Sequence, residues 1–293
     1  MKKMIATVLA TVAVCSTSFA ACTATPSYNN DNSKGVKVYQ SILLTEEDYA
    51  FAIKKENTSL LTSVNELIAD MKEDGSLNAL IDSYFDGTAT FTYTNKTSSP
   101  ADGDFVMATN AYFPPFEYYE GEAFKGVDVE MAYVIAQKLG KTLFVKDMDF
   151  DTIIADVKNG SSDIGMAGMT VTDERLEQVA FATPYYKSAQ VLTVKVSNTK
   201  FDGCTTAEQV ENILKAQSKS FKVGTQTGTT GYMYSAGDED FGYDGFKNLE
   251  TKSYQTGALA MTDLDNGRID AVILDLQPSL MIAQSINAKY HYK

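Results

Sequence analysis

The residues whose types and spacing suggest chemistry are concentrated in residues 162–186, SDIGMAGMTVTDERLEQVAFATPYY. The run predicts a buried strand over 164–168, a short loop and then a helix. That helix is expected to begin near Thr172, a good N-cap residue, with two acidic residues following at its positive end. Arg175 therefore falls in the first turn, where a guanidinium has no obvious structural task.

Three donor groups are expected to converge where this strand ends. Gly168 lets the backbone approach a ligand closely, Thr170 carries a hydroxyl, and Arg175 carries a guanidinium. An arginine holds a carboxylate through two parallel hydrogen bonds, and a helix N-terminus favours negative charge. The pattern predicts a carboxylate-binding site; the alternative is an arginine on the solvated face of a helix.

The segment AGMTVTDERLEQVAFATPYY closely resembles the signature of the solute-binding proteins of polar amino-acid ABC importers, bacterial extracellular solute-binding family 3. Four more segments resemble the same family: NAYFPPFEYYEG (110–121), MDFDTIIADVKNGSSD (148–163), VGTQTGTTG (223–231) and IDAVILD (269–275). The resemblance implies an α/β protein with the two-lobed periplasmic-binding-protein-like fold, type II. It also implies a ligand cleft and a two-strand hinge, which we expect near residues 45–52 and 190–196.

An amino-acid zwitterion needs a cation for its carboxylate and an anion for its ammonium group. The resemblance implies that the ligand carboxylate is bound by Arg175, Thr170 and the backbone of Gly168. The ammonium site falls on Asp275, at the end of IDAVILD. The alternative for Asp275 is a helix cap, since Pro278 follows it in the first turn of a predicted helix.

Six further ligand-binding candidates are carried over in the same way: Asn110, Phe113, Phe150, Gln226, Thr229 and Thr230. The two threonines would close over the ligand from the second lobe, or else form a tight glycine-rich turn. The two phenylalanines would sandwich the ligand side chain, or else belong to the core. The asparagine and the glutamine would recognise that side chain, and because neither is charged we expect a neutral, polar amino acid.

The order of the segments departs from the family pattern. The segment VKVYQSILLTEEDYAFAIKK and two predicted helices, which resemble the family's C-terminal end, come first in this chain. We therefore expect a circular permutation, with a polar linker joining the family's usual termini; the rival interpretation is a domain-swapped oligomer. The expected parts are lobe two (36–48 and 192–293), lobe one (49–90 and 104–191) and the linker (91–103).

The N-terminus has the pattern of an export signal. Residues 1–21 combine two lysines, an apolar run and small residues, as in a secretory signal peptide. The sequence FAAC resembles a lipoprotein box, which makes Cys22 the expected lipid anchor and residues 22–35 a flexible tether. The alternative is plain cleavage near Ala20 or Ala21. Either way we expect an extracytoplasmic protein, which would contact the membrane only if Cys22 carries a lipid anchor.

Composition and pattern narrow the remaining function classes. The chain of 293 residues has a formal net charge of −13, which argues against nucleic acid as a partner. Strands and helices alternate from residue 105 onward, which predicts a parallel α/β architecture. One histidine and no Cys–His pair argue against catalysis, and no cofactor or metal is expected.

The expected function is that of a monomeric substrate-binding protein. It would capture an amino acid in the interlobe cleft and deliver it to an ABC-transporter permease, without acting as an enzyme. The alternatives are a cyclohexadienyl-dehydratase-like enzyme on the same fold and a ligand-sensing module.

Overall fold

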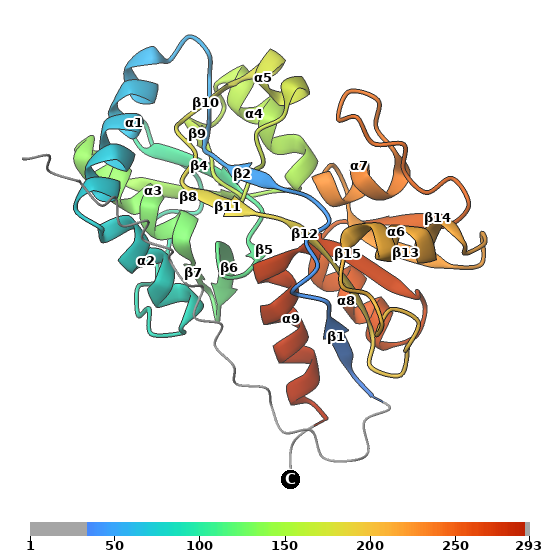
Figure 1. Cartoon of the computed structure of the whole chain (residues 1–293). Coiled ribbons are helices and arrows are strands. Elements are labelled where there is room, and N and C mark those ends of the chain that lie inside the picture. Colours follow the sequence, from blue (N-terminus) through green and yellow to red (C-terminus); the bar gives the residue numbers. More distant parts are fainter. Residues whose placement is uncertain (1–33, 291–293) are drawn as a thin grey trace, which may run out of the picture. The chain divides into compact units, whose positions relative to one another are not determined.

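The computed structural model of the protein describes residues 34–290 (Figure 1). The expected signal peptide, Cys22 and most of the expected tether lie outside these residues. Within 34–290, no helix has the length and apolar character needed to span a membrane.

Two five-stranded sheets organise the described chain. The lobe-one sheet runs in the order β10 (Ala180–Phe181), β3 (Ala52–Ile53), β9 (Ile164–Gly165), β4 (Phe105–Thr109) and β8 (Leu143–Asp147). The lobe-two sheet runs in the order β1 (Val36–Val38), β12 (Gln190–Lys195), β15 (Ala271–Asp275), β13 (Lys222–Gln226) and β14 (Glu250–Tyr254).

Both sheets are mixed, although the pattern predicts parallel strands. The pairs of β4 with β8 and β9, and of β13 with β14 and β15, are parallel. The strands supplied by the N-terminal segment enter antiparallel, β3 beside β9 and β1 beside β12. The expected strand over 164–168 is also shorter, since β9 contains only Ile164–Gly165.

Lobe one carries these helices: α1 (Thr58–Glu73), α2 (Ser76–Phe85), α3 (Val127–Lys138), the 3₁₀ turn η1 (Phe150–Thr152), α4 (Ile153–Asn159) and α5 (Asp173–Gln178). Helix α1 buries Leu60, Val64, Ile68 and Met71, the periodic apolar positions of its sequence. It ends just before Gly75, whose φ of +81° is in the left-handed region that favours glycine.

A small three-stranded sheet, β5 (Tyr112–Phe113), β6 (Glu117–Glu120) and β7 (Ala123–Lys125), completes this lobe. The sequence pattern did not predict it, because its strands are short and its residues are aromatic on both faces.

Lobe two carries α6 (Ala207–Lys215), α7 (Thr230–Ala236), α8 (Gly257–Asp265) and α9 (Leu276–Ala288). Successive residues of a strand point to opposite faces of a sheet, so neighbouring residues of β15 belong to different layers. Ile273 packs with buried residues of α6 and α7, whereas Val272 and Leu274 pack in the cluster that contains α8 and α9. Helices therefore cover both faces of this sheet.

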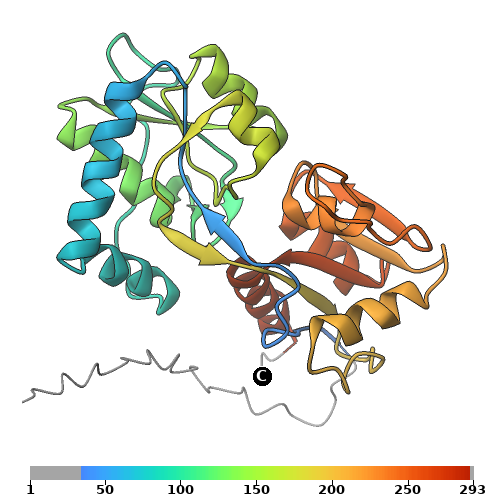
Figure 2. The same ribbon diagram turned by 45° about the horizontal axis from the view of Figure 1, so that its top comes forward.

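A two-stranded antiparallel ribbon, β2 (Glu47–Tyr49) paired with β11 (Tyr186–Ser188), connects the two sheets (Figure 2). The chain passes through β2 on its way from β1 to β3, and through β11 on its way from β10 to β12. One expected hinge segment, 45–52, contains β2. The other, 190–196, corresponds to β12, which already pairs with β15; the crossing lies a few residues earlier.

Residues 91–103 run along the edge of lobe one with little regular structure. Tyr93 forms an isolated bridge with Phe124, and the Asn95 side chain exchanges two hydrogen bonds of 2.8 Å with the backbone of Val145. Because β8 is an edge strand, Asn95 satisfies backbone groups that a neighbouring strand would otherwise bind. This segment connects α2 to β4.

Candidate ligand-binding site

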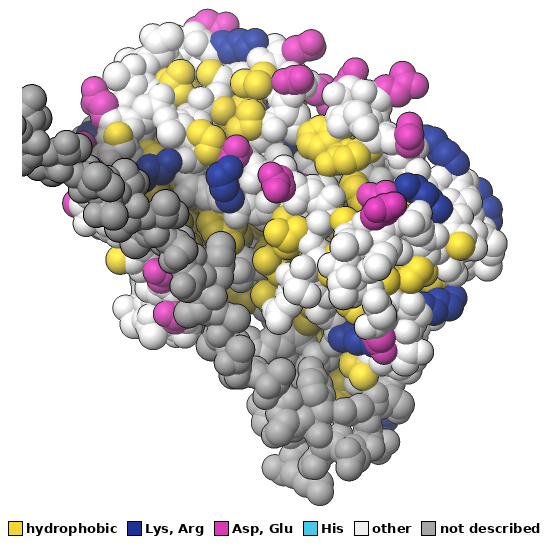
Figure 3. All heavy atoms as spheres, in the orientation of Figure 1, with side chains coloured by type: hydrophobic (Ala, Val, Ile, Leu, Met, Phe, Trp, Pro, Cys, Tyr) yellow, Lys and Arg dark blue, Asp and Glu magenta, His cyan; other side chains and the backbone are white. Residues whose placement is uncertain are grey.

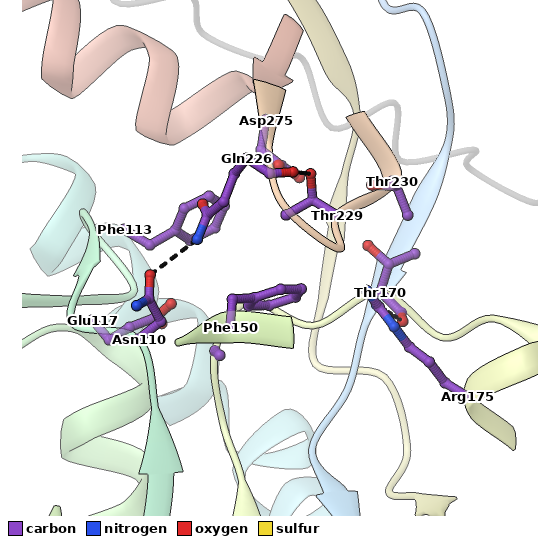
Figure 4. A pocket seen from close by; sticks show the side chains of 12 residues that line it. Asn110, Phe113, Glu117, Phe150, Thr170, Arg175, Gln226, Thr229, Thr230 and Asp275 are labelled. Atoms are coloured by element: carbon purple, nitrogen blue, oxygen red, sulfur yellow. Dashed lines mark hydrogen bonds between the residues drawn. The ribbon is translucent and has the colours of Figure 1, made fainter. Parts of the chain in front are cut away.

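All ten residues selected from the sequence line one pocket between the lobes, together with Glu117 and Ala167 (Figure 4). They converge because most of them follow the carboxyl ends of strands, where ligands bind in open α/β sheets. Asn110 follows β4, Gln226 ends β13 and Asp275 ends β15. Thr229 and Thr230 form the N-terminus of α7.

Arg175 is buried at the lobe boundary, with 6% of its surface exposed. Its Nη1 donates to the Thr170 carbonyl at 2.6 Å, and its Nη2 donates across the cleft to the Gly228 carbonyl at 2.9 Å. The Phe150 ring lies 5.3 Å from the guanidinium carbon. These contacts exclude the alternative of an arginine on a solvated helix face.

The charge of Arg175 persists in this position. Burial lowers its pKa to about 10, which still leaves the guanidinium protonated at neutral pH. Thr172 caps α5 as predicted, since its hydroxyl accepts the Arg175 N–H at 3.2 Å. The cap and the two carbonyl acceptors hold the guanidinium at the pocket wall.

Gly168 has a φ of +51°, and a Cβ atom there would meet the Phe113 ring at 2.6 Å. A side chain at this position would therefore collide with Phe113, which lines the pocket. The Gly168 N–H donates to Asp128 Oδ2 at 3.0 Å, so in this structure it is engaged within the protein.

The hydroxyls of Thr170 and Thr230 both bind Glu47, a residue that was not among the ligand-binding candidates expected from the sequence. They donate to the same oxygen, Glu47 Oε2, at 2.6 and 2.8 Å. Glu47 lies in the connecting ribbon and is 5% exposed. The run TEEDY suggests a polar turn, but the period-two spacing of Glu47 and Tyr49 could have indicated that both face inward.

Asp275 occupies the N-cap position of α9, yet its side chain makes no capping hydrogen bond. Its Oδ1 instead accepts from the Tyr49 hydroxyl and, at 3.4 Å, from the Ser188 hydroxyl. Burial, and then the nearby charge of Glu47, raise the pKa of Asp275 to about 7. The capping alternative is therefore wrong, and the carboxyl group faces the pocket.

Thr229, in contrast, has the turn role that was considered as its alternative. Its hydroxyl donates to the Gln226 carbonyl at 2.8 Å and caps α7 by accepting the Tyr232 N–H at 3.4 Å. Gln226 in turn donates from Nε2 to Asn110 Oδ1 across the cleft at 3.0 Å. The two amides that were expected to recognise a side chain thus bond to each other.

Glu117 is the second residue that sequence reasoning missed. It is fully buried, lines the pocket, and neither carboxylate oxygen has a hydrogen-bond partner among the described residues. Burial raises the pKa of Glu117 well above its ordinary value, and the charges of Asp128 and Asp275 raise it further. A glutamate at a buried position of an aromatic strand, FEYYE, was the signal that could have identified it.

The pocket residues span two chemically distinct ends. In Figure 4, Arg175 and Thr170 lie on one side, Asn110, Phe113 and Glu117 lie on the other, and Phe150 lies between them. Asp275 approaches from lobe two. An elongated ligand with an anionic end near Arg175 and a cationic end near Glu117 would match this arrangement.

The cavity among these side chains has a volume of about 10 Å³, room for about one water molecule. Arg175 and Asn110 of lobe one already contact Gly228 and Gln226 of lobe two. An amino acid therefore enters only if the lobes separate. A wider groove of about 770 Å³ is also lined by Asn110. Within residues 34–290, no group of three His, Cys, Asp or Glu side chains is placed to hold a metal ion.

Two α/β lobes on a two-stranded ribbon, with oppositely charged side chains buried between them, define a bilobed ligand-binding protein. A family model, bacterial extracellular solute-binding proteins, family 3, matches residues 105–241. The chain belongs to this family. The matched region contains nine of the ten selected site residues, all except Asp275.

Curated relatives have the names of amino-acid-binding proteins. The arginine-binding extracellular protein ArtP of Bacillus subtilis is 39% identical over 101 residues, which is 34% of this chain and 40% of the relative. The putative ABC transporter arginine-binding protein 2 of Escherichia coli is 32% identical over 170 residues, which is 58% of this chain and 62% of the relative. A probable histidine-binding protein of Neisseria gonorrhoeae is 28% identical, and the match covers 58% of each chain.

Solved structures agree with this assignment. An ancestral arginine-binding protein bound to arginine is 32% identical to this chain, with a TM-score of 0.51. The match covers 62% of this chain and 74% of that structure. An ancestral amino acid-binding protein, a precursor of cyclohexadienyl dehydratase, is 27% identical with a TM-score of 0.53 and the same coverage. This chain spans between 40% and 62% of the length of the first two curated relatives. The names of these relatives support a binding protein rather than an enzyme.

Proposed function

We propose that this protein captures an amino acid between its lobes and delivers it to the permease of an ABC transporter. The observation that carries the proposal is one pocket in which a buried arginine, Arg175, is opposed by two buried carboxyl groups, Asp275 and Glu117. Arg175 would bind the ligand carboxylate through its remaining N–H groups, and Asp275 would bind the α-ammonium group. Both contacts exclude water, which strengthens them.

The ligand we propose is a basic amino acid. The expectation of a neutral ligand depended on Asn110 and Gln226, which bond to each other, and it left Glu117 out. A buried carboxyl group without a partner is costly, and a ligand cation would supply the missing donors. The three curated relatives described above have names that specify arginine or histidine, which supports the same class.

Charge balance supports this choice. A basic amino acid has one anionic and two cationic groups. Arg175 would match the first, and Asp275 and Glu117 would match the other two. A neutral amino acid would leave the Glu117 carboxyl group unpaired, or protonated, at the far end of the pocket.

The test is a calorimetric titration of arginine, lysine, histidine and glutamine into the wild-type protein, Glu117→Gln and Arg175→Ala. Arg175→Ala should weaken every ligand by about 30-fold or more, because it removes one partner of a buried charge pair. Glu117→Gln should weaken only the basic ligands, by about tenfold or more, and leave glutamine within about threefold.

Two results would contradict the proposal in separable ways. Glutamine binding the wild-type protein more tightly than arginine would reject the basic ligand class alone. An Arg175→Ala variant that binds every ligand like the wild type would reject the pocket itself. Arg268→Ala, which removes an arginine that is paired on the surface with Asp263, is the matched control.

We propose further that the chain is a circularly permuted member of its family and a monomer. The N-terminal segment supplies β1 to lobe two and β3 to lobe one, and residues 91–103 would replace the family's free termini. The family model begins to match at residue 105, just after this linker, which supports the proposal. The chain would be extracytoplasmic, held at the membrane through Cys22.

A further inference from the structure

Glu47 is a buried carboxylate that receives hydroxyl groups from both lobes. Oε2 accepts from Thr170 of lobe one at 2.6 Å and from Thr230 of lobe two at 2.8 Å, while Oε1 accepts from Thr45 at 2.8 Å. The Thr230 hydroxyl is oriented from its other side, because Gln190 Nε2 donates to it at 3.0 Å. A carboxylate that accepts several short hydrogen bonds forms charge-assisted contacts, which are stronger than neutral ones.

Glu47 lies behind the pocket and does not line it. Thr170 and Thr230 separate it from the cavity, and it belongs to the ribbon that connects the lobes. It would therefore influence a ligand through these hydroxyls and through the position of the lobes. Direct contact with the ligand is not part of its role.

The backbone fixes which lobe Glu47 follows. The Val171 N–H donates to the Asp48 carbonyl at 3.0 Å, and the Ala50 N–H donates to the Met169 carbonyl at 3.0 Å. These bonds hold the segment of Thr170 against β2 beside Glu47, whereas the neighbouring Thr45 hydroxyl accepts the Gln190 N–H of lobe two at 2.8 Å. If the Glu47 carboxylate stays with Thr170 when the lobes separate, its bond to Thr230 breaks.

We propose that Glu47 is a positioning residue that latches lobe two in the closed arrangement through Thr230, and so sets how slowly the ligand leaves. The proposal rests on the proposed function for its effect on ligand release, but its effect on lobe closure does not need a ligand. When a ligand closes the lobes, Glu47 and Thr230 would give up water and form their hydrogen bond in its place. An open protein would exchange this bond for water.

The experiment compares the wild-type protein with Glu47→Gln and, as a matched control, Glu46→Gln, whose side chain is exposed on the same segment. Small-angle scattering without ligand should show a larger radius of gyration for Glu47→Gln and an unchanged one for Glu46→Gln. Stopped-flow measurements with arginine should show a dissociation rate at least about fivefold faster for Glu47→Gln, with an association rate within about twofold.

A double-mutant cycle with Thr230→Val separates the latch from a general loss of packing. If Glu47 acts through Thr230, the second substitution should add little to the dissociation rate of the first. Thr230→Val alone also provides the scattering test if Glu47→Gln does not fold.

An unchanged radius and dissociation rate in Glu47→Gln would overturn the proposal. Slower dissociation would also overturn it, because it would mean that Glu47 opposes binding. If the wild-type protein binds none of the amino acids, the proposed function fails, while the ligand-free scattering comparison still tests the latch.

Discussion

At the scale of single residues, the site is a set of buried ionisable groups that lack complete partners. Arg175 is held by two carbonyl groups, Asp275 by hydroxyl groups, and Glu117 by no described hydrogen-bond partner. Burying a charge without an opposite charge is unfavourable for folding, and function is the usual reason for it. Under the proposed function, a zwitterionic ligand would supply the missing partners and stabilise the folded protein.

The raised pKa of Asp275 gives ligand binding and folding opposite dependences on pH. In the folded protein the pKa of this carboxyl group is about 7, above the value near 4 of an unfolded chain. Asp275 therefore favours folding most at low pH, and this contribution is lost as the pH rises from about 4 through 7. An ammonium ligand needs the ionised form, so the affinity for arginine should fall by up to about tenfold per pH unit below 7.

The measurement is the melting temperature between pH 5 and 8, with and without arginine. The rise caused by arginine should grow with pH, and Asp275→Asn should lose both the rise and its pH dependence. Asp149→Asn, a substitution at an exposed position near the cleft, is the control and should behave like the wild type. A ligand-induced rise that is the same at pH 5 and pH 8 would contradict the role of Asp275.

At the scale of elements, the N-terminal segment supplies an interior strand, β3, to the lobe-one sheet and an edge strand, β1, to the lobe-two sheet. Strand β1 lies at the edge of the lobe-two sheet, where unpaired backbone groups would be exposed. Asn287 of α9 covers them, since its Oδ1 accepts the Val36 N–H at 2.9 Å and its Nδ2 donates to the Val36 carbonyl at 2.8 Å. One side chain thus replaces a neighbouring strand.

Asn287→Ala should lower the free energy of unfolding by about 1–3 kcal/mol, because both backbone groups of Val36 lose a partner in a partly buried place. Denaturant unfolding measures the effect, with Asn266→Ala as an exposed control in the same lobe. A loss below about 0.3 kcal/mol would indicate that water replaces both bonds, and that β1 is held by its pairing with β12 alone.

At the scale of the whole molecule, the protein is acidic, with more Asp and Glu than Lys and Arg. On the face drawn in Figure 3, acidic and basic side chains are both spread over the surface around scattered hydrophobic groups. The charges that matter for the proposed function are therefore the few that are buried between the lobes. The steering of a small cation by the net charge of −13 would be a general effect.

The proposed permutation predicts that the segments can be put back into the family order. A chain that runs from residue 104 to 290, continues through an eight-residue Gly-Ser linker, and then from 36 to 90 should fold without residues 91–103. The Asn287–Val36 contact places the new junction within reach, since eight residues span up to about 28 Å. Arginine affinity within about threefold of the wild type is the expected result.

Light scattering of the natural chain supplies the second half of this test. A monomer that binds at all dilutions agrees with the permutation. An obligate dimer that loses binding on dilution would favour the domain-swapped interpretation. The folding test of the rearranged chain has its own contrary outcome. The permutation is contradicted if that chain fails to fold while residues 104–290 fold alone.

Local sequence was enough to predict those features that depend on neighbours along the chain. The Thr172 cap, the buried face of α1 and the left-handed Gly75 each follow from spacing within about one helical turn or two. Residues at the ends of strands could be selected for the same reason, because motif segments contain both the strand and its loop. Sheet direction could not, since β1 and β3 pair with strands more than 100 positions away.

The tertiary structure decided what each polar group does. The local patterns around Glu47 and Glu117 indicate at most that each side chain faces inward, and only the packing of the two lobes buries them beside Thr170, Thr230 and Asp275. In the same packing, Asn110 and Gln226, which were expected to contact a ligand, form a hydrogen bond with each other. The Asp275 side chain makes no hydrogen bond that caps α9. Hydrogen-bond partners and burial are properties of the folded surroundings, so these roles could be read only after both lobes were in place.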